Sequence, residues 1–157
     1  MTPNTFKKIS ILLIGFLILV TIYPIIEATF PISKYSEIAL LGPNGKVGEY
    51  QNQVKLGERL PFSIYLANYE ANVELYRLEV KLVQNTTLAN NPPYNTIPIF
   101  TDIVVLDNEK NTTRTIDASL SNPFNGKLVI ELYKFDSDTG TYLFNNRWIS
   151  AWLKTTN

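Results

Sequence analysis

One stretch constrains this chain more than any other: residues 9–26, which read ISILLIGFLILVTIYPII without a charged side chain. An α-helix of that length spans ~27 Å, close to the thickness of a bilayer's hydrocarbon core. Lys7 and Lys8 precede the run, and Glu27 follows it. Because positive charge favours the cytoplasmic side, the pattern predicts a single-pass signal anchor in the plasma membrane. Residues 1–8 would then be cytoplasmic and the rest of the chain outside.

The same run has a second interpretation as a secretory signal that is removed. Signal peptides have a shorter apolar region, of about 7–15 residues, and small residues at the cleavage site. Cleavage after Ala28 is the best position here, but Ile26 stands where a small residue is preferred. A pilin-type leader would be cut before the run, at Lys8-Ile9, and it also lacks a small residue there. The uncleaved anchor is therefore favoured, with cleavage as the alternative.

The chain contains neither cysteine nor histidine, and these two absences limit the covalent links, the catalysis and the metal binding that it can support. It therefore has no disulfide, no cysteine-linked lipid, and neither the commonest general base nor the commonest metal ligand. Haem, copper and iron–sulfur centres need His, Cys or several Met residues. The 14 basic and 14 acidic residues balance, which gives no charge excess for nucleic acid. We expect no cofactor, no nucleic-acid partner and no catalysis.

Beyond the apolar run, residues 27–36 predict an extended linker, and residues 37–157 suit one domain. The clearest strand is 73–83, where strict alternation puts one set of side chains inward and the other outward. The inward set is Tyr76, Leu78, Val80 and Leu82, and the outward set is Arg77, Glu79 and Lys81.

Other segments of the domain predict further strands and the turns between them. The predicted strands are 37–41, 60–67, 97–106, 113–120, 127–135, 142–144 and 147–154, and the connections are 42–48, 84–96, 107–111, 121–126, 136–141 and 145–146. Seven or eight short strands without a second helix are typical of an all-β domain. We expect an immunoglobulin-like β-sandwich, although the Cys and Trp hallmarks of antibody domains are absent.

Two Asn-Thr-Thr sequons begin at Asn85 and Asn111, both in predicted loops. Glycosylation requires such exposure on the outer side, so both asparagines are candidate acceptors. The residues Asp136-Ser137-Asp138-Thr139-Gly140 match the first half of a calcium loop, but Arg147 stands where the loop requires Glu. A plain turn is favoured, and a weak calcium site at Asp136 and Asp138 is the alternative.

Trp148 and Trp152 fall on one face of the last predicted strand, with Ser150 between them. The alternation places Ile149, Ala151 and Leu153 on the other face. A spaced aromatic pair of this kind forms a sugar platform or a partner surface in some proteins. Packing within the domain or against the membrane is the simpler interpretation.

The domain also resembles a known archaeal family, domain of unknown function 1616. The matching residues are 37–50, which read EIALLGPNGKVGEY, together with Val54, Gly57-Glu58, Asn68-Tyr69-Glu70, Glu131-Leu132-Tyr133, Arg147-Trp148 and Trp152-Leu153. The resemblance covers most of residues 35–154. It implies an archaeal membrane-anchored protein with an extracytoplasmic β-sandwich, and it implies no activity. Many members place a His where Tyr69 stands, so any role of that His is absent here.

Together these features predict a single-pass membrane protein whose outer domain is a binding or assembly module. It would be an accessory subunit of a membrane complex or a cell-envelope component, with the membrane, envelope proteins or further copies of itself as partners. The alternative is a secreted subunit of a filament or surface layer, which donates residues 27–36 as a strand to its neighbour. A third option, an enzyme accessory or hydrolase, would need a cleft with a perturbed acidic residue.

Overall fold

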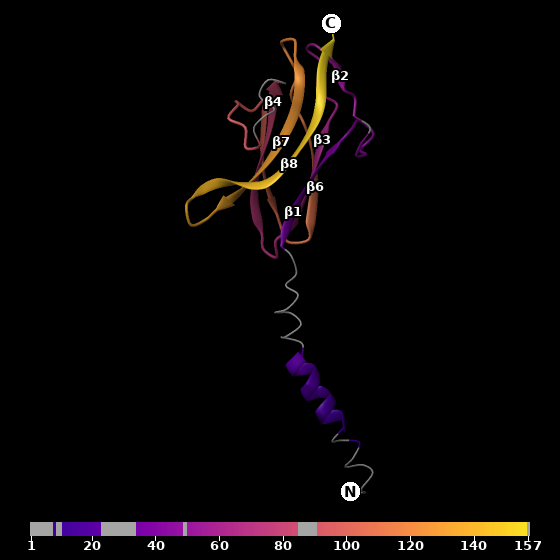
Figure 1. The fold of residues 1–157 in the computed structure, drawn as a ribbon, viewed down its shortest axis with the longest axis vertical. Helices are drawn as coiled ribbons and strands as arrows, with labels where there is room; N and C mark the ends of the chain where they lie inside the picture. The colour runs from indigo at the N-terminus through magenta and orange to yellow at the C-terminus, as the bar shows by residue number, and fades with distance from the viewer. Residues whose placement is uncertain (1–7, 9–10, 23–33, 49, 85–90, 157) are drawn as a thin grey trace. The chain divides into compact units, whose positions relative to one another are not determined.

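Two β-sheets form the folded domain of the computed structural model, which describes residues 8, 11–22, 34–48, 50–84 and 91–156 (Figure 1). The chain divides into two units, residues 1–33 and 34–157. In the first unit, residues 11–22 are helical. Among the described residues, no helix combines the length and the apolar character needed to cross a membrane. The predicted span also includes residues 9, 10 and 23–26, which lie outside the described part, so the anchor stays a prediction.

The smaller sheet has three antiparallel strands in the order β1-β3-β6, which are Tyr35–Leu41, Ser63–Tyr69 and Lys110–Thr115. The larger sheet has the order β2-β8-β7-β4-β5. Its strands are Gln53–Lys55, Thr141–Thr156, Asn125–Asp136, Glu74–Gln84 and Phe100–Leu106. The β2–β8 pair is parallel, and the other pairs are antiparallel. The prediction of an all-β domain is confirmed.

The hydrophobic core lies between the two sheets, because inward side chains of both belong to one buried cluster. Leu40, Ile64 and Leu66 come from the smaller sheet, and Tyr76, Leu78, Val80, Leu128, Ile130 and Leu132 come from the larger one. Alternation predicted these inward faces of β4 and β7. The core therefore fixes which faces of both sheets point outward.

The structure corrects several predicted boundaries. Tyr35 and Ser36 were assigned to the linker, but they pair with β3 as the first residues of β1. The strand predicted at 113–120 ends at Thr115 as β6, and β2 has no counterpart among the predicted strands. These differences arise where strand pairing, rather than local alternation, decides the structure.

The predicted turn at Asn145 and Asn146 is instead a bulge within one continuous strand, β8. The β7–β8 register shifts between Leu132 and Tyr133, and Asn146 has a φ of 52°. Asn tolerates this left-handed conformation better than most residues, and bulges bend the strand that carries them. The end of the β7–β8 hairpin accordingly projects from the rest of the domain (Figure 1).

Candidate functional site

Five polar side chains gather on the outer face of β4 and β7, and we call them the outer-face cluster: Arg77, Glu79, Lys81, Glu131 and Tyr133. Alternation places them on the face opposite the core. Their outward direction was predicted for β4, but their burial was not. Lys81 is 4% exposed and Glu131 is fully buried, so another part of the chain covers this face.

The covering segment is residues 91–99, and Tyr94 is its main contact. The Lys81 ammonium lies 2.7 Å from Glu131 Oε2 and donates a hydrogen bond of 2.8 Å to the Tyr94 carbonyl. The Tyr94 N–H donates to Glu131 Oε1 at 2.6 Å. The Tyr94 ring packs in a small hydrophobic cluster with Val83 and Val129. One buried ion pair thus holds both backbone polar groups of Tyr94 against the sheet.

Further partners complete the charge balance of the cluster. Lys81 Nζ is also 2.9 Å from Glu79 Oε2, and Tyr133 donates its hydroxyl hydrogen to Glu131 Oε2 at 2.7 Å. The Arg77 guanidinium lies over the rings of Tyr133 and Tyr142, 4.7 Å from each centroid. Such cation–π contacts are attractive. Because Tyr142 belongs to the projecting hairpin, Arg77 connects that hairpin to the sheet.

The protonation of the cluster is that of a structural ion pair. Burial alone would lower the pKa of Lys81, but its hydrogen bonds to Glu131 and Glu79 outweigh that effect and raise the pKa above its ordinary value. Burial, assisted by the bond to Glu131, raises the pKa of Tyr133 to about 12. A nucleophilic or general-base lysine would need a lowered pKa. The arrangement is therefore suited to holding the 91–99 segment in place.

These shifts predict sensitivity to alkali. Tyr76 is also buried, and burial raises its pKa to about 12. A pKa that is higher in the folded state stabilises the protein below the unfolded value, ~10 for Tyr and Lys, and this contribution is lost as the pH rises through the folded value. We expect the free energy of unfolding, measured with urea, to fall steadily above about pH 10. Tyr133→Phe should make the decline shallower, whereas equal stabilities at ~pH 8 and ~pH 11 would contradict this linkage.

A second polar network lies at the end of the domain where β1 begins. Ser36 donates to Glu70 Oε1 at 2.7 Å, and Tyr76 donates to Asn68 Oδ1 at 3.1 Å. Asn145, in the bulge of β8, donates to Ser36 Oγ at 3.1 Å. This network joins both sheets and the hairpin. Alternation placed Tyr76 inward, but no local pattern identified partners so distant in the sequence.

The two tryptophans lie where the alternation of the last strand predicted them. Trp148 is 46% and Trp152 is 50% exposed on the outer face of β8, while Ala151 and Leu153 are buried. Each indole lines its own open hollow, of ≈ 330 Å³ beside Trp148 and ≈ 390 Å³ beside Trp152. Lys127 Nζ lies 5.4 Å from the Trp152 ring centroid. The indoles thus belong to neighbouring hollows along one strand.

The other predicted site residues lie apart from these features. Asn85 is outside the described residues. Asn111 is exposed, but it lies in the edge strand β6 and not in a loop, because its backbone pairs with Ala67. Asp136 Oδ1 accepts the Asp138 N–H at 2.9 Å within the hairpin turn, and this bond lowers the pKa of Asp136. No group of three or more His, Cys, Asp or Glu suited to a metal occurs among the described residues.

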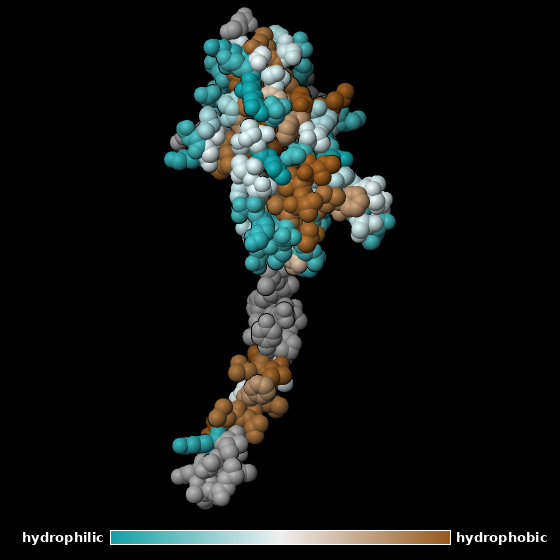
Figure 2. Space-filling view, turned by 180° about the vertical axis from the view of Figure 1, so that it is seen from behind, coloured by the Kyte–Doolittle hydropathy of each residue, from teal (hydrophilic) through white to brown (hydrophobic). Residues whose placement is uncertain are grey.

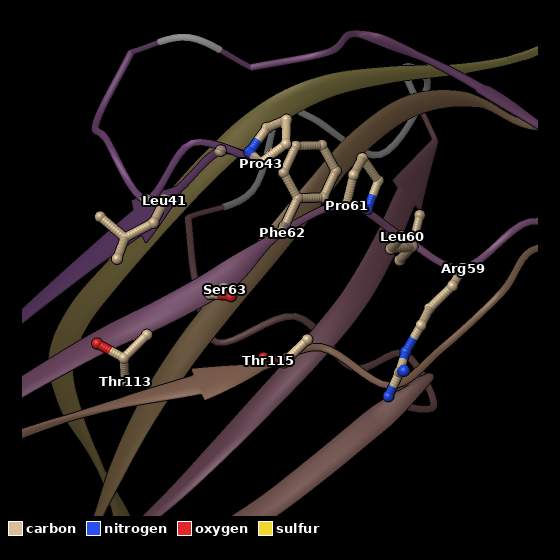
Figure 3. Close-up of a pocket in the computed structure, with 11 residues that line it drawn as sticks. Leu41, Pro43, Arg59, Leu60, Pro61, Phe62, Ser63, Thr113 and Thr115 are labelled. Atoms are coloured by element: carbon tan, nitrogen blue, oxygen red, sulfur yellow. The ribbon is translucent and has the colours of Figure 1, made fainter.

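An open groove of ≈ 400 Å³ lies where β1 ends, between the following turn and β6. Figure 3 shows the rings of Pro43, Pro61 and Phe62 close together, while the Arg59 side chain extends away from them. Arg59 is already paired with Asp117 at 2.9 Å. Apart from Arg59, the residues that line the groove carry no acidic or basic side chain beside its hydroxyls.

Exposed apolar side chains occur on the outer face of β5. Ile103 is 55% and Val105 is 64% exposed, and Val73, which directly precedes β4, is 60% exposed. Figure 2 shows hydrophobic side chains gathered on the domain beside the projecting hairpin. Surfaces of this kind occur at contact sites, although the described residues do not indicate what would cover this one.

The comparisons with known proteins add little to this geometry. No protein family model and no curated protein matches the chain. Among solved structures, the soluble domain of PmoD from Methylocystis sp. (Rockwell) matches with a TM-score of 0.33 and 11% identity, over 81% of this chain and 95% of that one. Similarity at this level carries no functional argument. The archaeal resemblance stays a prediction, and function is argued from the residues themselves.

Proposed function

We propose that the chain is a membrane-anchored module that assembles with other proteins on the outer side of the plasma membrane. Its domain would be an immunoglobulin-like sandwich that acts as an accessory subunit without catalysis of its own. The observation that carries this proposal is the pair of half-exposed tryptophans on β8. Tryptophan is enriched in protein interfaces and often supplies much of their binding energy.

The rigidity of β8 strengthens this argument. Ala151 and Leu153 are buried on the inner face of the strand, so Trp148 and Trp152 are held outward by the core itself. Each indole leaves a large apolar area in water, and burying it against a partner is favourable. A preorganised aromatic surface also loses little conformational entropy on binding. A partner surface is therefore favoured over internal packing for these two residues.

The apolar run at residues 9–26 supports the location, because it has the length and composition of a membrane span. Anchoring would raise the local concentration of the domain near other membrane proteins. The alternative, a secreted subunit that donates residues 27–36, has less chain to donate than expected. Tyr35 and Ser36 already pair with Tyr69 and Asn68 of their own chain, which leaves 27–34.

Because the chain has no cysteine, single-cysteine variants test the topology directly. In intact cells a membrane-impermeant maleimide should label Ser121→Cys, at an exposed position of the outer domain, and should label Thr5→Cys only after lysis. The detergent-extracted protein should have an intact mass that begins at or near Met1. The reverse labelling pattern would overturn the proposed topology, and a mass that begins near residue 29 would favour the secreted alternative.

The same extract tests the assembly itself. The native mass of the wild-type particle, corrected for detergent, should exceed that of one chain. Replacing Trp148 and Trp152 together with Ala should reduce it to one chain and leave the circular-dichroism spectrum unchanged, since both indoles are half exposed. Replacing Ile103 and Val105 with Ala on the other apolar surface is the matched control. An unchanged native mass in the tryptophan variant would contradict the proposal.

A further inference from the structure

We propose that the hollow beside Trp152 binds a sugar unit that carries a carboxylate, of the kind that makes up acidic polysaccharides. The indole stacks on the sugar ring, and Lys127 pairs with the carboxylate. The site shares Trp152 with the assembly surface proposed above but does not rest on it, because a single chain is enough to form the hollow. The inference is carried by the residues that line the hollow and by the charges around it.

Both walls of this hollow are fixed by the domain itself. One wall is β8, and the other is the chain that leads into β2. In that chain the Tyr50 hydroxyl donates to the Leu40 carbonyl at 2.9 Å, and the Asn52 carbonyl accepts the Lys154 N–H at 2.8 Å. The hollow is therefore preformed. Its volume of ≈ 390 Å³ lies within the range of ligand pockets, ~300–1,000 Å³.

The indole of Trp152 supplies an apolar platform for the ligand. The residue is 50% exposed, so half of its side chain is open to a ligand. The face of an aromatic ring carries partial negative charge, and one face of a pyranose consists mostly of C–H groups with partial positive charge. A sugar ring can therefore stack on the indole while its hydroxyls stay free at the rim.

Polar side chains beside the indole suit the hydroxyls of such a sugar. Asn52 and Ser150 line the same hollow, and within the described part of the chain neither side chain has a hydrogen-bond partner. A carboxamide and a hydroxyl each donate and accept hydrogen bonds, as sugar hydroxyls do. The ligand would therefore leave few of its polar groups without a partner.

The charge around the hollow selects an anion. Lys127 is paired with Trp152 across β7 and β8, and its ammonium lies 5.4 Å from the centroid of the indole. Lys154 is exposed two residues further along β8. Neither lysine has an ion-pair partner among the described residues, and none of the described residues that line the hollow is acidic. A carboxylate on Lys127 would lie ~2.7–2.9 Å from its nitrogen, close enough for the same sugar to contact the indole.

The hollow beside Trp148 provides a comparison on the same strand. It is lined by Glu37 as well as Arg147, so an acidic side chain there opposes the binding of an anion. The two indoles are almost equally exposed, at 46% for Trp148 and 50% for Trp152. The difference in charge therefore predicts that an acidic sugar binds at Trp152 and not at Trp148.

The test uses the full chain in detergent, with its tryptophans as fluorescent reporters. Because the chain has two Trp residues, Trp148→Phe keeps one indole at the proposed site, and Trp152→Phe keeps one outside it. When a linear hexamer of glucuronate is added, the fluorescence of Trp148→Phe should change and saturate, whereas that of Trp152→Phe should stay constant. Adding Lys127→Gln to the Trp148→Phe chain should weaken binding ~10-fold or more, since a charge-assisted hydrogen bond is lost.

Three controls distinguish recognition of an acidic sugar from charge or stacking alone. Lys110→Gln removes an exposed lysine on β6 and should change the affinity less than ~2-fold, because water and salt screen distant charges. The glucose hexamer with the same linkage lacks the carboxylates, and a hexaglutamate peptide lacks the sugar rings. Each should bind ~10-fold or more weakly than the glucuronate hexamer.

The proposal would be overturned by the absence of a saturable change in Trp148→Phe, by an equal response of Trp152→Phe, or by equally tight binding of either control ligand. The native mass that tests the assembly is measured without any sugar. Failure of the sugar site is therefore distinguishable from failure of the proposed function.

Discussion

Replacing Lys81 with Met is expected to lower the free energy of unfolding by about 3–5 kcal/mol, the usual cost of removing one partner from a buried ion pair. Met keeps most of the apolar stem of Lys, so the loss of packing is small. The Glu131 carboxylate, which is fully buried, would lose the ammonium 2.7 Å away. The measurement is urea unfolding of the wild type and the variant at neutral pH.

A matched exposed pair provides the control. Arg59 and Asp117 are 2.9 Å apart, but their side chains are 62% and 73% exposed. Because water screens such pairs, Arg59→Met should cost about 1 kcal/mol or less. The double variant Lys81→Met with Glu131→Gln should recover part of the single variant's loss, since it removes the stranded charge. If Lys81→Met costs no more than Arg59→Met, the pair does not hold the domain together.

A local measurement distinguishes the release of the segment 91–99 from a general loss of stability. The Tyr94 N–H donates to Glu131 and the Tyr94 carbonyl accepts from Lys81. Under conditions where Lys81→Met is still folded, the Tyr94 amide should exchange with deuterium faster than in the wild type, because the segment 91–99 is released first. Amides in the middle of β3, which the Lys81–Glu131 ion pair does not contact, should keep their protection.

The sequence contained enough information to predict the faces of the central strands but not their covering. Alternation along β4 correctly put Tyr76 and Leu78 inward and Lys81 outward. By pattern alone Lys81 and Lys127 look alike, since both are outward cations on neighbouring strands. They differ because Tyr94 covers Lys81. Which loop returns to which face is a tertiary property, and no local periodicity encodes it.

The tryptophan surface was predictable only in part, for a similar reason. Alternation places Trp148 and Trp152 on the same face but does not predict their exposure, and the structure leaves both about half exposed. Their surroundings depend on β2, which pairs with β8 only from Lys154 onward. That short strand has too few residues for a recognisable pattern. The sequence predicts a turn at Asn145 and Asn146 where the structure has a bulge, because Asn favours both structures.

Gly126 is the residue whose observed structure differs most from the predicted one, and replacing it is expected to destabilise the domain strongly. It was assigned to a turn, but it lies in β7, paired with Gln84 of β4 and with Leu153 of β8. A Cβ there would collide with the Val83 carbonyl oxygen and come within 2.8 Å of the Phe124 ring. Gly in a strand often marks such a close backbone approach.

Gly126→Ala should therefore lower the free energy of unfolding by about 3 kcal/mol, at the upper end of the usual cost of overpacking, because a backbone atom cannot move aside as a side chain can. Gly140→Ala is the matched control. Gly140 has a φ of 65° but nothing within 4 Å of the added Cβ, so it should cost only about 1–2 kcal/mol from the left-handed backbone. Urea unfolding of both variants decides the matter. If Gly126→Ala lowers the free energy of unfolding no more than Gly140→Ala does, the close approach of β4 and β7 at Gly126 is contradicted.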